Sequence, residues 1–245
     1  EGRLGGFPCF FADARTERGS REIGTVETAS MLGERQEKAL DRWLVDTACP
    51  GPKFLVSGSM VLPRRLEVRD GTAAAAMRSD AWDGYPASLH RLLAGIYVRG
   101  LNDIVHLSGD EHVSNVTRIE IRRNGVPKAV TAYSIHSSAL YAPYPFANGS
   151  EEDFANSESF AFHHEGHEYD CTVTAWYPQT GDGFALVNVA REASDWLVQV
   201  RFDRAARAPD DRLCRAFRIP LAVEGAGLAS ALATAQVVDR PYIAS

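Results

Sequence analysis

The chain has 245 residues, with 26 basic and 32 acidic side chains and a formal net charge of −6. Hydrophobic residues make up 45% and charged residues 24%, which excludes a disordered or fibrous protein. The net negative charge disfavours binding to a phosphate backbone, so nucleic acid is not an expected partner. No apolar run approaches the roughly 18 to 20 residues of a membrane helix, which predicts a soluble chain with one domain over residues 1–245.

Cysteine spacing and the amino-terminal residues say little about compartment. The four cysteines (Cys9, Cys49, Cys171 and Cys214) form no CxxC pair, so neither a zinc knuckle nor a redox dithiol is indicated. We expect buried free thiols, with one or two disulfides as the alternative. The chain starts at Glu1 without a signal peptide or lipidation motif, so the sequence indicates no compartment.

The first part of the chain, residues 7–115, alternates between strand and helix patterns. Short apolar runs predict buried strands at 7–12, 53–58 and 103–109. An i, i+4, i+8 apolar spacing predicts helices over 32–48 and 86–100, with Pro86 at the start of the second and Gly100 at its end. This order predicts parallel α/β units. The helix residues expected to be buried against the sheet are Leu40, Trp43, Leu92, Leu93 and Ile96.

The second part, residues 116–245, is predicted to be rich in β-strands. A period-two run at 116–122, the type I′ turn signal Asn124-Gly125 and a returning run at 129–135 predict a hairpin. Residues 138–165 are expected to form a long loop. Further strands are predicted at 169–177, 184–190 and 196–202, with Gly181-Asp182-Gly183 as the turn between the first two.

The sharpest candidate site is the segment Leu107-Ser-Gly-Asp-Glu-His112, just past a predicted buried strand. In open α/β sheets, ligands bind beyond the carboxyl ends of strands. Asp110 and His112 offer a carboxylate oxygen and an imidazole nitrogen, both of which coordinate metal ions. The alternative is a capping aspartate beside a surface histidine.

Two other polar segments are candidates for the same site. Asp13-Ala-Arg15-Thr-Glu-Arg18 places two guanidinium groups, suited to bidentate recognition of phosphate or carboxylate, after a strand-terminal carboxylate. A structural ion-pair loop is equally consistent with it. Ser79–Pro86 groups two carboxylates and two aromatic rings before a helix, and Asp80 or Asp83 capping that helix is the simpler interpretation.

Two further patterns favour structural interpretations. The segment His163-His164-Glu165-Gly166-His167 lacks the HExxH spacing and is expected to be a solvated polar turn. The sequences Asn115-Val-Thr117 and Asn148-Gly-Ser150 match the glycosylation pattern, which occurs often by chance.

Taken together and in order, these segments resemble the alkaline phosphatase D (PhoD-like) metallophosphatases. The resemblance covers about residues 7–115 and continues more weakly through 137–148. The motifs that carry it are Asp13-Ala-Arg15-Thr-Glu-Arg18, Leu32-Gly-Glu-Arg-Gln36 before the Leu40/Trp43/Leu44 helix, Asp80-Ala-Trp-Asp-Gly-Tyr-Pro86, Arg91-Leu-Leu93 and Leu107-Ser-Gly-Asp-Glu-His112.

The resemblance implies a fold, a cofactor and a reaction. The fold is the metallophosphoesterase-like four-layer α/β/β/α sandwich, of which this chain matches the carboxyl-terminal half. The cofactor is a dinuclear metal centre, commonly iron with calcium, with Asp110 and His112 as metal ligands. The substrate is a phosphomonoester or phosphodiester, which two cations would clamp while lowering the pKa of a bridging water. The resemblance further suggests Arg15 and Asp80 as catalytic residues, with Arg15 gripping phosphate.

Three further residues, Asp13, Trp82 and Tyr85, would line or brace the site. The sequence also departs from the family pattern, because metallophosphatases take their first ligands from an upstream half. No such series precedes Asp13, no Gly-Asn-His occurs, and the only other Gly-Asp is Gly181-Asp182. We therefore expect either a fragment of a longer enzyme or a truncated relative that needs a partner or has lost catalysis. The rival hypothesis is a non-catalytic, β-rich binding or scaffolding module.

Overall fold

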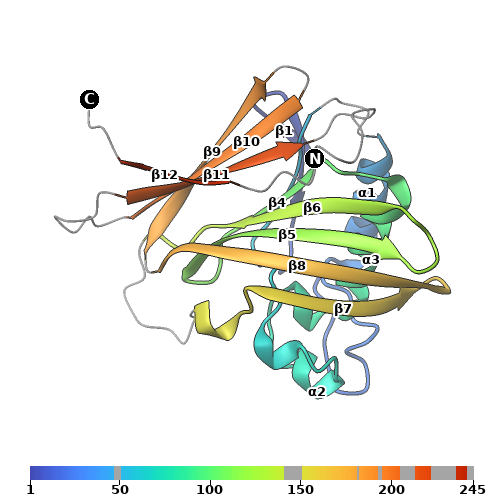
Figure 1. Ribbon diagram of the computed structural model, residues 1–245. Coiled ribbons are helices and arrows are strands. Elements are labelled where there is room, and N and C mark those ends of the chain that lie inside the picture. Colours follow the sequence, from blue (N-terminus) through green and yellow to red (C-terminus); the bar gives the residue numbers. More distant parts are fainter. Residues whose placement is uncertain are drawn as a thin grey trace.

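The computed structural model describes residues 1–46, 51–140, 151–180, 182–192, 195–204, 213–221 and 236–241. These residues form two β-sheets and a few helices (Figure 1). The large sheet contains β1 (Gly2–Leu4), β2 (Phe7–Ala12), β3 (Lys53–Ser57), β4 (Ile104–Ser108), β5 (Val113–Arg123), β6 (Ala129–His136), β7 (Ser157–His164) and β8 (His167–Thr180). The small sheet contains β9 (Gly183–Glu192), β10 (Asp195–Arg204), β11 (Leu213–Leu221) and β12 (Gln236–Pro241).

The large sheet has the strand order β1-β2-β3-β4-β6-β5-β8-β7. Its central strands β2, β3, β4 and β6 are parallel, so their carboxyl ends lie at one edge of the sheet. Helix α1 (Gly33–Asp46) connects β2 to β3, and α3 (Pro86–Arg99) lies between β3 and β4. A short helix, α2 (Ala73–Ala76), precedes α3. The predicted strand-helix alternation over residues 7–109 is therefore confirmed.

Helix α3 begins and ends as the sequence predicts. Pro86 occupies its first turn, and Gly100 adopts φ 69° after its last residue, where its N–H reaches the carbonyls of Ile96 and Tyr97. The expected capping by Asp80 or Asp83 is wrong. The residue before the helix is Tyr85, which makes no side-chain cap, and Asp83 instead accepts the N–H of Arg65 at 2.8 Å.

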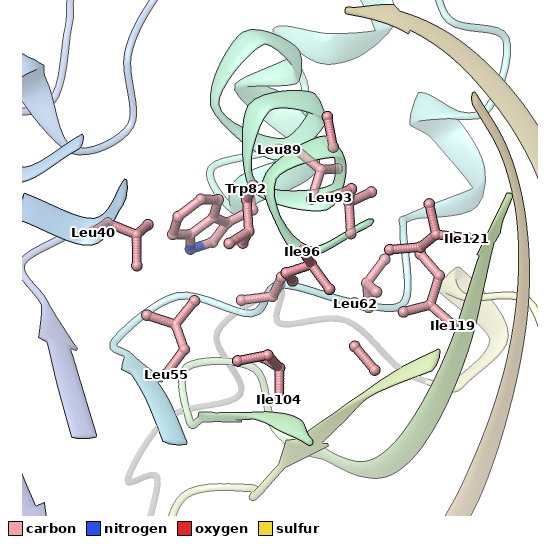
Figure 2. Packing of buried hydrophobic residues seen from close by; sticks show 14 of the residues in the cluster. Leu40, Leu55, Leu62, Trp82, Leu89, Leu93, Ile96, Ile104, Ile119 and Ile121 are labelled. Atoms are coloured by element: carbon pink, nitrogen blue, oxygen red, sulfur yellow. The ribbon is translucent and has the colours of Figure 1, made fainter. Parts of the chain in front are cut away.

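The main hydrophobic core lies between the helices and the large sheet (Figure 2). All five helix residues predicted to be buried are at most 5% exposed. Trp82 is fully buried beside them, and its indole nitrogen donates to Ser57 Oγ at 3.0 Å. The core residues labelled in Figure 2 are Leu40, Leu55, Leu62, Trp82, Leu89, Leu93, Ile96, Ile104, Ile119 and Ile121.

The small sheet packs on the opposite face of the large sheet, away from α1 and α3 (Figure 1). A second core lies between the two sheets, and β10 and β11 contribute buried side chains to it, among them Val198, Val200 and Ile219. Strands β8, β9 and β10 confirm the three predicted carboxyl-terminal strands. Of the turn predicted between the first two, Gly181 lies outside the described residues.

The β5–β6 hairpin is confirmed, but its predicted type I′ turn is wrong. Strand β5 ends at Arg123 and β6 begins only at Ala129. The turn is closed by the N–H of Val126 on the carbonyl of Arg123, with positive φ at Gly125 and not at Asn124. The next residue is Pro127, which has no N–H for the strand ladder, so pairing resumes later.

The long loop predicted over 138–165 is also wrong in part, because residues 157–164 form β7. Residues 141–150 lie outside the described structure. The sequence of β7 has no regular hydrophobic pattern, because one of its buried residues is Glu158. Arg64 and Arg69 each donate a hydrogen bond to Glu158 Oε2 at 3.0 Å. Glu165 and Gly166, both with positive φ, join β7 to β8. The predicted solvated turn around the histidines is thus confirmed.

Two further predictions concern cysteines and membrane spans. Cys9 and Cys171 are buried free thiols, as expected. Cys49 and the side chain of Cys214 lie outside the described structure. No helix formed by the described residues is both long and apolar enough to cross a membrane.

Candidate functional site

The candidate site residues gather where the parallel strands of the large sheet end. Asp13 directly follows β2, Ser59 lies two residues after β3, and Asp110 lies two residues after β4. Because these strands are parallel neighbours, their following segments share one edge. The fold therefore brings segments about fifty residues apart in the chain to one place.

Asp13 shapes the first of these segments. Its carboxylate accepts the backbone N–H groups of Arg15 at 3.0 Å and Thr16 at 2.9 Å. Hydrogen bonds from Thr16, together with the one from Arg15, lower the pKa of Asp13. The side chain of Gln36 on α1 accepts a hydrogen bond from the N–H of Asp13 and donates one to the carbonyl of Asp13, each at 3.0 Å. Asp13 therefore braces the turn that presents Arg15.

Arg15 bridges two carboxylates from distant segments. Its Nη1 donates to Asp80 Oδ2 at 2.5 Å, and its Nη2 lies 3.3 Å from Asp110 Oδ2. Arg18 also pairs with Asp80. The side chains of Arg15 and Asp80 are more than half exposed, so this cluster opens to solvent. The structure thus brings together Arg15, Asp80 and Asp110.

The charges in this cluster affect one another. The hydrogen bond to Asp80 raises the pKa of Arg15, which stays protonated. Burial raises the pKa of Asp110, while the nearby Arg15 opposes that change. A bound cation beside Asp110 would favour its charged form in the same way as Arg15 does.

Trp82 and Tyr85 brace the site and do not line it. Trp82 is in the core, and Tyr85 is 2% exposed with the guanidinium of Arg21 4.3 Å above its ring centre. Arg21 also donates to the carbonyls of Ser79 and Gly84, each at 2.7 Å. A side chain at Gly84 would lie 2.2 Å from the carbonyl oxygen of Ser79, so only glycine fits there. These contacts fix the segment that carries Asp80.

His136 holds the segment that carries Asp110 and His112, and the sequence analysis missed it. Its Nδ1 lies 2.9 Å from Ser108 Oγ, and its Nε2 lies 3.2 Å from both the N and the O of Glu111. Burial lowers the pKa of His136 to about 4, so the ring is neutral at pH 7. The only sequence signal was its position at the end of a predicted strand.

Glu111 ties the same segment to the loop after β3. It is buried and pairs with Arg65, whose guanidinium lies over the ring of Phe154. This pair and His136 fix the backbone on both sides of Asp110. His112 follows on the same segment and is partly buried.

The site offers part of a ligand set for a metal ion. Among the described residues, no group of three or more His, Cys, Asp or Glu lies close enough together to hold a metal ion. Asp80 and Asp110 are linked through Arg15, which pairs with both carboxylates. Asp110 and His112, one hard oxygen donor and one nitrogen donor on a fixed segment, therefore fit part of a ligand set. Their role as metal ligands stays a prediction.

Comparison with known proteins identifies the family. The model of the PhoD-like phosphatase family matches residues 9–175. The chain belongs to this family. It is 40% identical over 52 residues to alkaline phosphatase D of Bacillus subtilis (strain 168), a match that covers 21% of this chain and 9% of that protein.

A solved structure shows the same fold. The structure of PhoD aligns with a TM-score of 0.51 at 15% identity, and it covers 88% of this chain. The alignment covers 41% of that PhoD chain. This chain therefore spans less than half the length of either relative. The resemblance read from the sequence is confirmed at the level of family and general fold.

Proposed function

We propose that this chain is part of a metal-dependent hydrolase that acts on phosphomonoesters or phosphodiesters. The observation that carries the proposal is the exposed guanidinium of Arg15 at the carboxyl edge of the sheet, held between Asp80 and Asp110. Membership in the PhoD-like phosphatase family supports a phosphate ester as the substrate.

Arg15 is the residue that would bind the phosphoryl group. Its planar guanidinium can donate two parallel hydrogen bonds to phosphate oxygens. Asp80, which pairs with both Arg15 and Arg18, would be a positioning residue that fixes the direction of this fork. Phosphate binding would then weaken the contact between Arg15 and Asp110 and free that carboxylate to act as a ligand.

Asp110 and His112 would hold one edge of a dinuclear metal centre, such as the iron and calcium pair that the family resemblance implies. Such a centre supplies a water of lowered pKa and neutralises charge on the leaving oxygen. His136 and Glu111 would keep the two ligands in place, as supporting residues do in metal sites. The other ligands would come from polypeptide that completes the four-layer α/β/β/α sandwich.

A second candidate function is non-catalytic binding or scaffolding by a derivative of this fold. It is favoured by the lack of a three-ligand cluster in the described part of the chain. In that case Arg15 would still bind anionic groups, but phosphate esters would not be cleaved.

The test compares two proteins, this 245-residue chain and the polypeptide translated from the natural start codon of its reading frame. Both are assayed with bis(p-nitrophenyl) phosphate and added iron, calcium or manganese. We expect little turnover from the 245-residue chain and metal-dependent turnover from a longer polypeptide that supplies the missing ligands. Substantial turnover by the 245-residue chain would show that another group, such as His163, His164 and His167, completes the site. No turnover by either protein would favour the scaffold.

A further inference from the structure

The two carboxylates that contact Arg15 hold it unequally. Its Nη1 donates to Asp80 Oδ2 at 2.5 Å, whereas its Nη2 lies 3.3 Å from Asp110 Oδ2. Hydrogen bonds between an ionised nitrogen donor and a carboxylate are usually about 2.7 to 2.9 Å long, so the contact with Asp110 is the weaker one. This contact can therefore break while Arg15 stays attached to Asp80.

Arg18 anchors Asp80 independently of Arg15. Its Nη1 pairs with Asp80 Oδ1, and its Nε donates to the carbonyl of Ala14 at 2.8 Å. The Arg18 side chain is 12% exposed, compared with 57% for Arg15. Asp80 therefore keeps a cationic partner when Arg15 turns toward a ligand, and Arg15 is the movable member of the pair.

The charges of this cluster are balanced. Two arginines, Arg15 and Arg18, pair with two aspartates, Asp80 and Asp110. The cluster thus carries no excess positive charge that would attract a phosphate group. A divalent cation beside Asp110 would take over that carboxylate and leave Arg15 with one acceptor fewer. The guanidinium of Arg15 and a metal ion are therefore competing partners of the same carboxylate.

We propose that the contact between Arg15 and Asp110 makes metal binding and phosphate binding at this site depend on each other. Without a metal ion, Arg15 occupies Asp110, and Asp110 competes with anions for Arg15. A metal ion on Asp110 releases Arg15 for phosphate, and phosphate on Arg15 releases Asp110 for the metal ion. Because binding free energies are linked, each ligand raises the affinity for the other. The inference rests on the proposed function, but its first consequence concerns this chain without metal.

A purely structural ion pair leads to the opposite expectation. If the contact with Asp110 served only to orient Arg15, its loss would leave the guanidinium less ordered and would weaken the binding of anions. If Asp110 competes for Arg15, the same loss strengthens the binding of anions. The sign of the change in affinity therefore separates the two interpretations.

Phosphate binding to the 245-residue chain tests the competition at Arg15. Inorganic phosphate is titrated without metal at physiological ionic strength and followed by NMR shifts of residues 13–18. Asp110→Asn removes the competing charge and should tighten binding about two- to fivefold, the range expected for breaking an exposed ion pair. Glu17→Gln, an exposed position two residues from Arg15, is the matched control for loss of one negative charge. It should change the affinity by less than about 1.5-fold, because salt screens exposed charges.

Two results of this titration would overturn the proposal. One is unchanged or weaker phosphate binding by Asp110→Asn, which is the expectation for a structural ion pair. The other is an equal gain in affinity in Glu17→Gln, which would show that only the net charge of the surface matters. Arg15→Met should abolish the shifts and thereby show that they report binding to this arginine.

Metal binding to the polypeptide translated from the natural start codon tests the competition at Asp110. Mn²⁺ is titrated without phosphate, and electron paramagnetic resonance measures the free ion. Arg15→Met removes the competing guanidinium and should tighten Mn²⁺ binding about two- to fivefold. Arg78→Met, an exposed position two residues from Asp80, controls for loss of one positive charge and should have a smaller effect.

The outcomes separate this inference from the proposed function. Mn²⁺ binding that is unchanged or weaker in Arg15→Met would overturn the inference and leave the proposed metal centre in place. No bound Mn²⁺ in the original sequence or in either variant would overturn the proposed metal centre, and the coupling with it.

Discussion

The two faces of the large sheet differ in how completely they are covered. On the helix face, Leu55 of β3, Ile104 of β4 and Leu93 of α3 are completely buried. On the other face, the small sheet buries Val105 but leaves Phe11 half exposed. The helices that cover the first face connect neighbouring strands of the large sheet along the chain. The second face is covered by a separate sheet, which comes later in the chain. Within the described residues, the helix face is thus completely covered at these positions, whereas the other face keeps Phe11 half exposed.

The largest effect should come from a cavity in the helix-face core. Leu93→Ala removes a completely buried side chain of α3 and should lower the free energy of unfolding by about 2 to 5 kcal/mol. Urea denaturation of the 245-residue chain measures this change. A decrease in the free energy of unfolding below about 1 kcal/mol would mean that this core is as loosely packed as the region around Phe11 on the other face.

Acid should destabilise the same chain through buried histidines. His106, fully buried on β4, has no hydrogen-bond partner for either ring nitrogen among the described residues, and burial lowers its pKa to about 4. The unfolded chain takes up this proton near the ordinary pKa of 6.5, so stability is present above pH 6.5 and is lost as pH falls toward 4. The slope is about 1.4 kcal/mol per pH unit for each such histidine.

The variant His106→Leu isolates this contribution. It removes one titrating group from an apolar site, so urea denaturation between pH 4.5 and 6.5 should show a shallower loss of stability than in the original chain. An unchanged slope would show that His106 takes up its proton equally in the folded and unfolded states.

The third prediction concerns the segment at the carboxyl edge. His136→Ala removes the contacts to Ser108 Oγ and to the backbone of Glu111, and should cost about 1 to 3 kcal/mol. Amide exchange in residues 109–112 should become faster than in Ser108→Ala, which removes one of these contacts only. Equal exchange in the two variants would mean that Arg65 and Glu111 alone fix the segment.

The smallest effect is expected on the open face. Phe11→Ser in the 245-residue chain should change the free energy of unfolding by about 1 kcal/mol or less, because half of this side chain already contacts water. Val98→Ser, exposed on the helix side, is the control of similar kind. If Phe11→Ser lowered the free energy of unfolding as much as Leu93→Ala does, the Phe11 side chain would be buried in the 245-residue chain.

Much of the helix face could be predicted from the sequence because its signals are local. The spacing of Leu89, Leu92, Leu93 and Ile96 and the flanking Pro86 and Gly100 specify α3 by themselves. Strand β7 could not be predicted in this way, since buried Glu158 depends on Arg64 and Arg69, which lie about ninety residues earlier.

The same distinction between local signals and long-range contacts applies to the candidate site. The grouping of Arg15, Asp80 and Asp110 was expected from motif order, because the fold family fixes where such segments meet. The support from His136 was not, because its contacts join β6 to the segment after β4 and leave no pattern within either strand. Long-range polar contacts of this kind depend on the strand order, which periodicity does not reveal.

The most direct test of the proposed function is the metal content of the polypeptide translated from the natural start codon. Elemental analysis after purification would compare the original sequence with His112→Ala and with the control His167→Ala in the exposed β7–β8 turn. Our account predicts that His112→Ala loses most of its bound metal, since a missing ligand weakens coordination sharply, while His167→Ala retains it. Equal metal content in all three proteins would contradict the assignment of His112 as a ligand and with it the proposed metal centre.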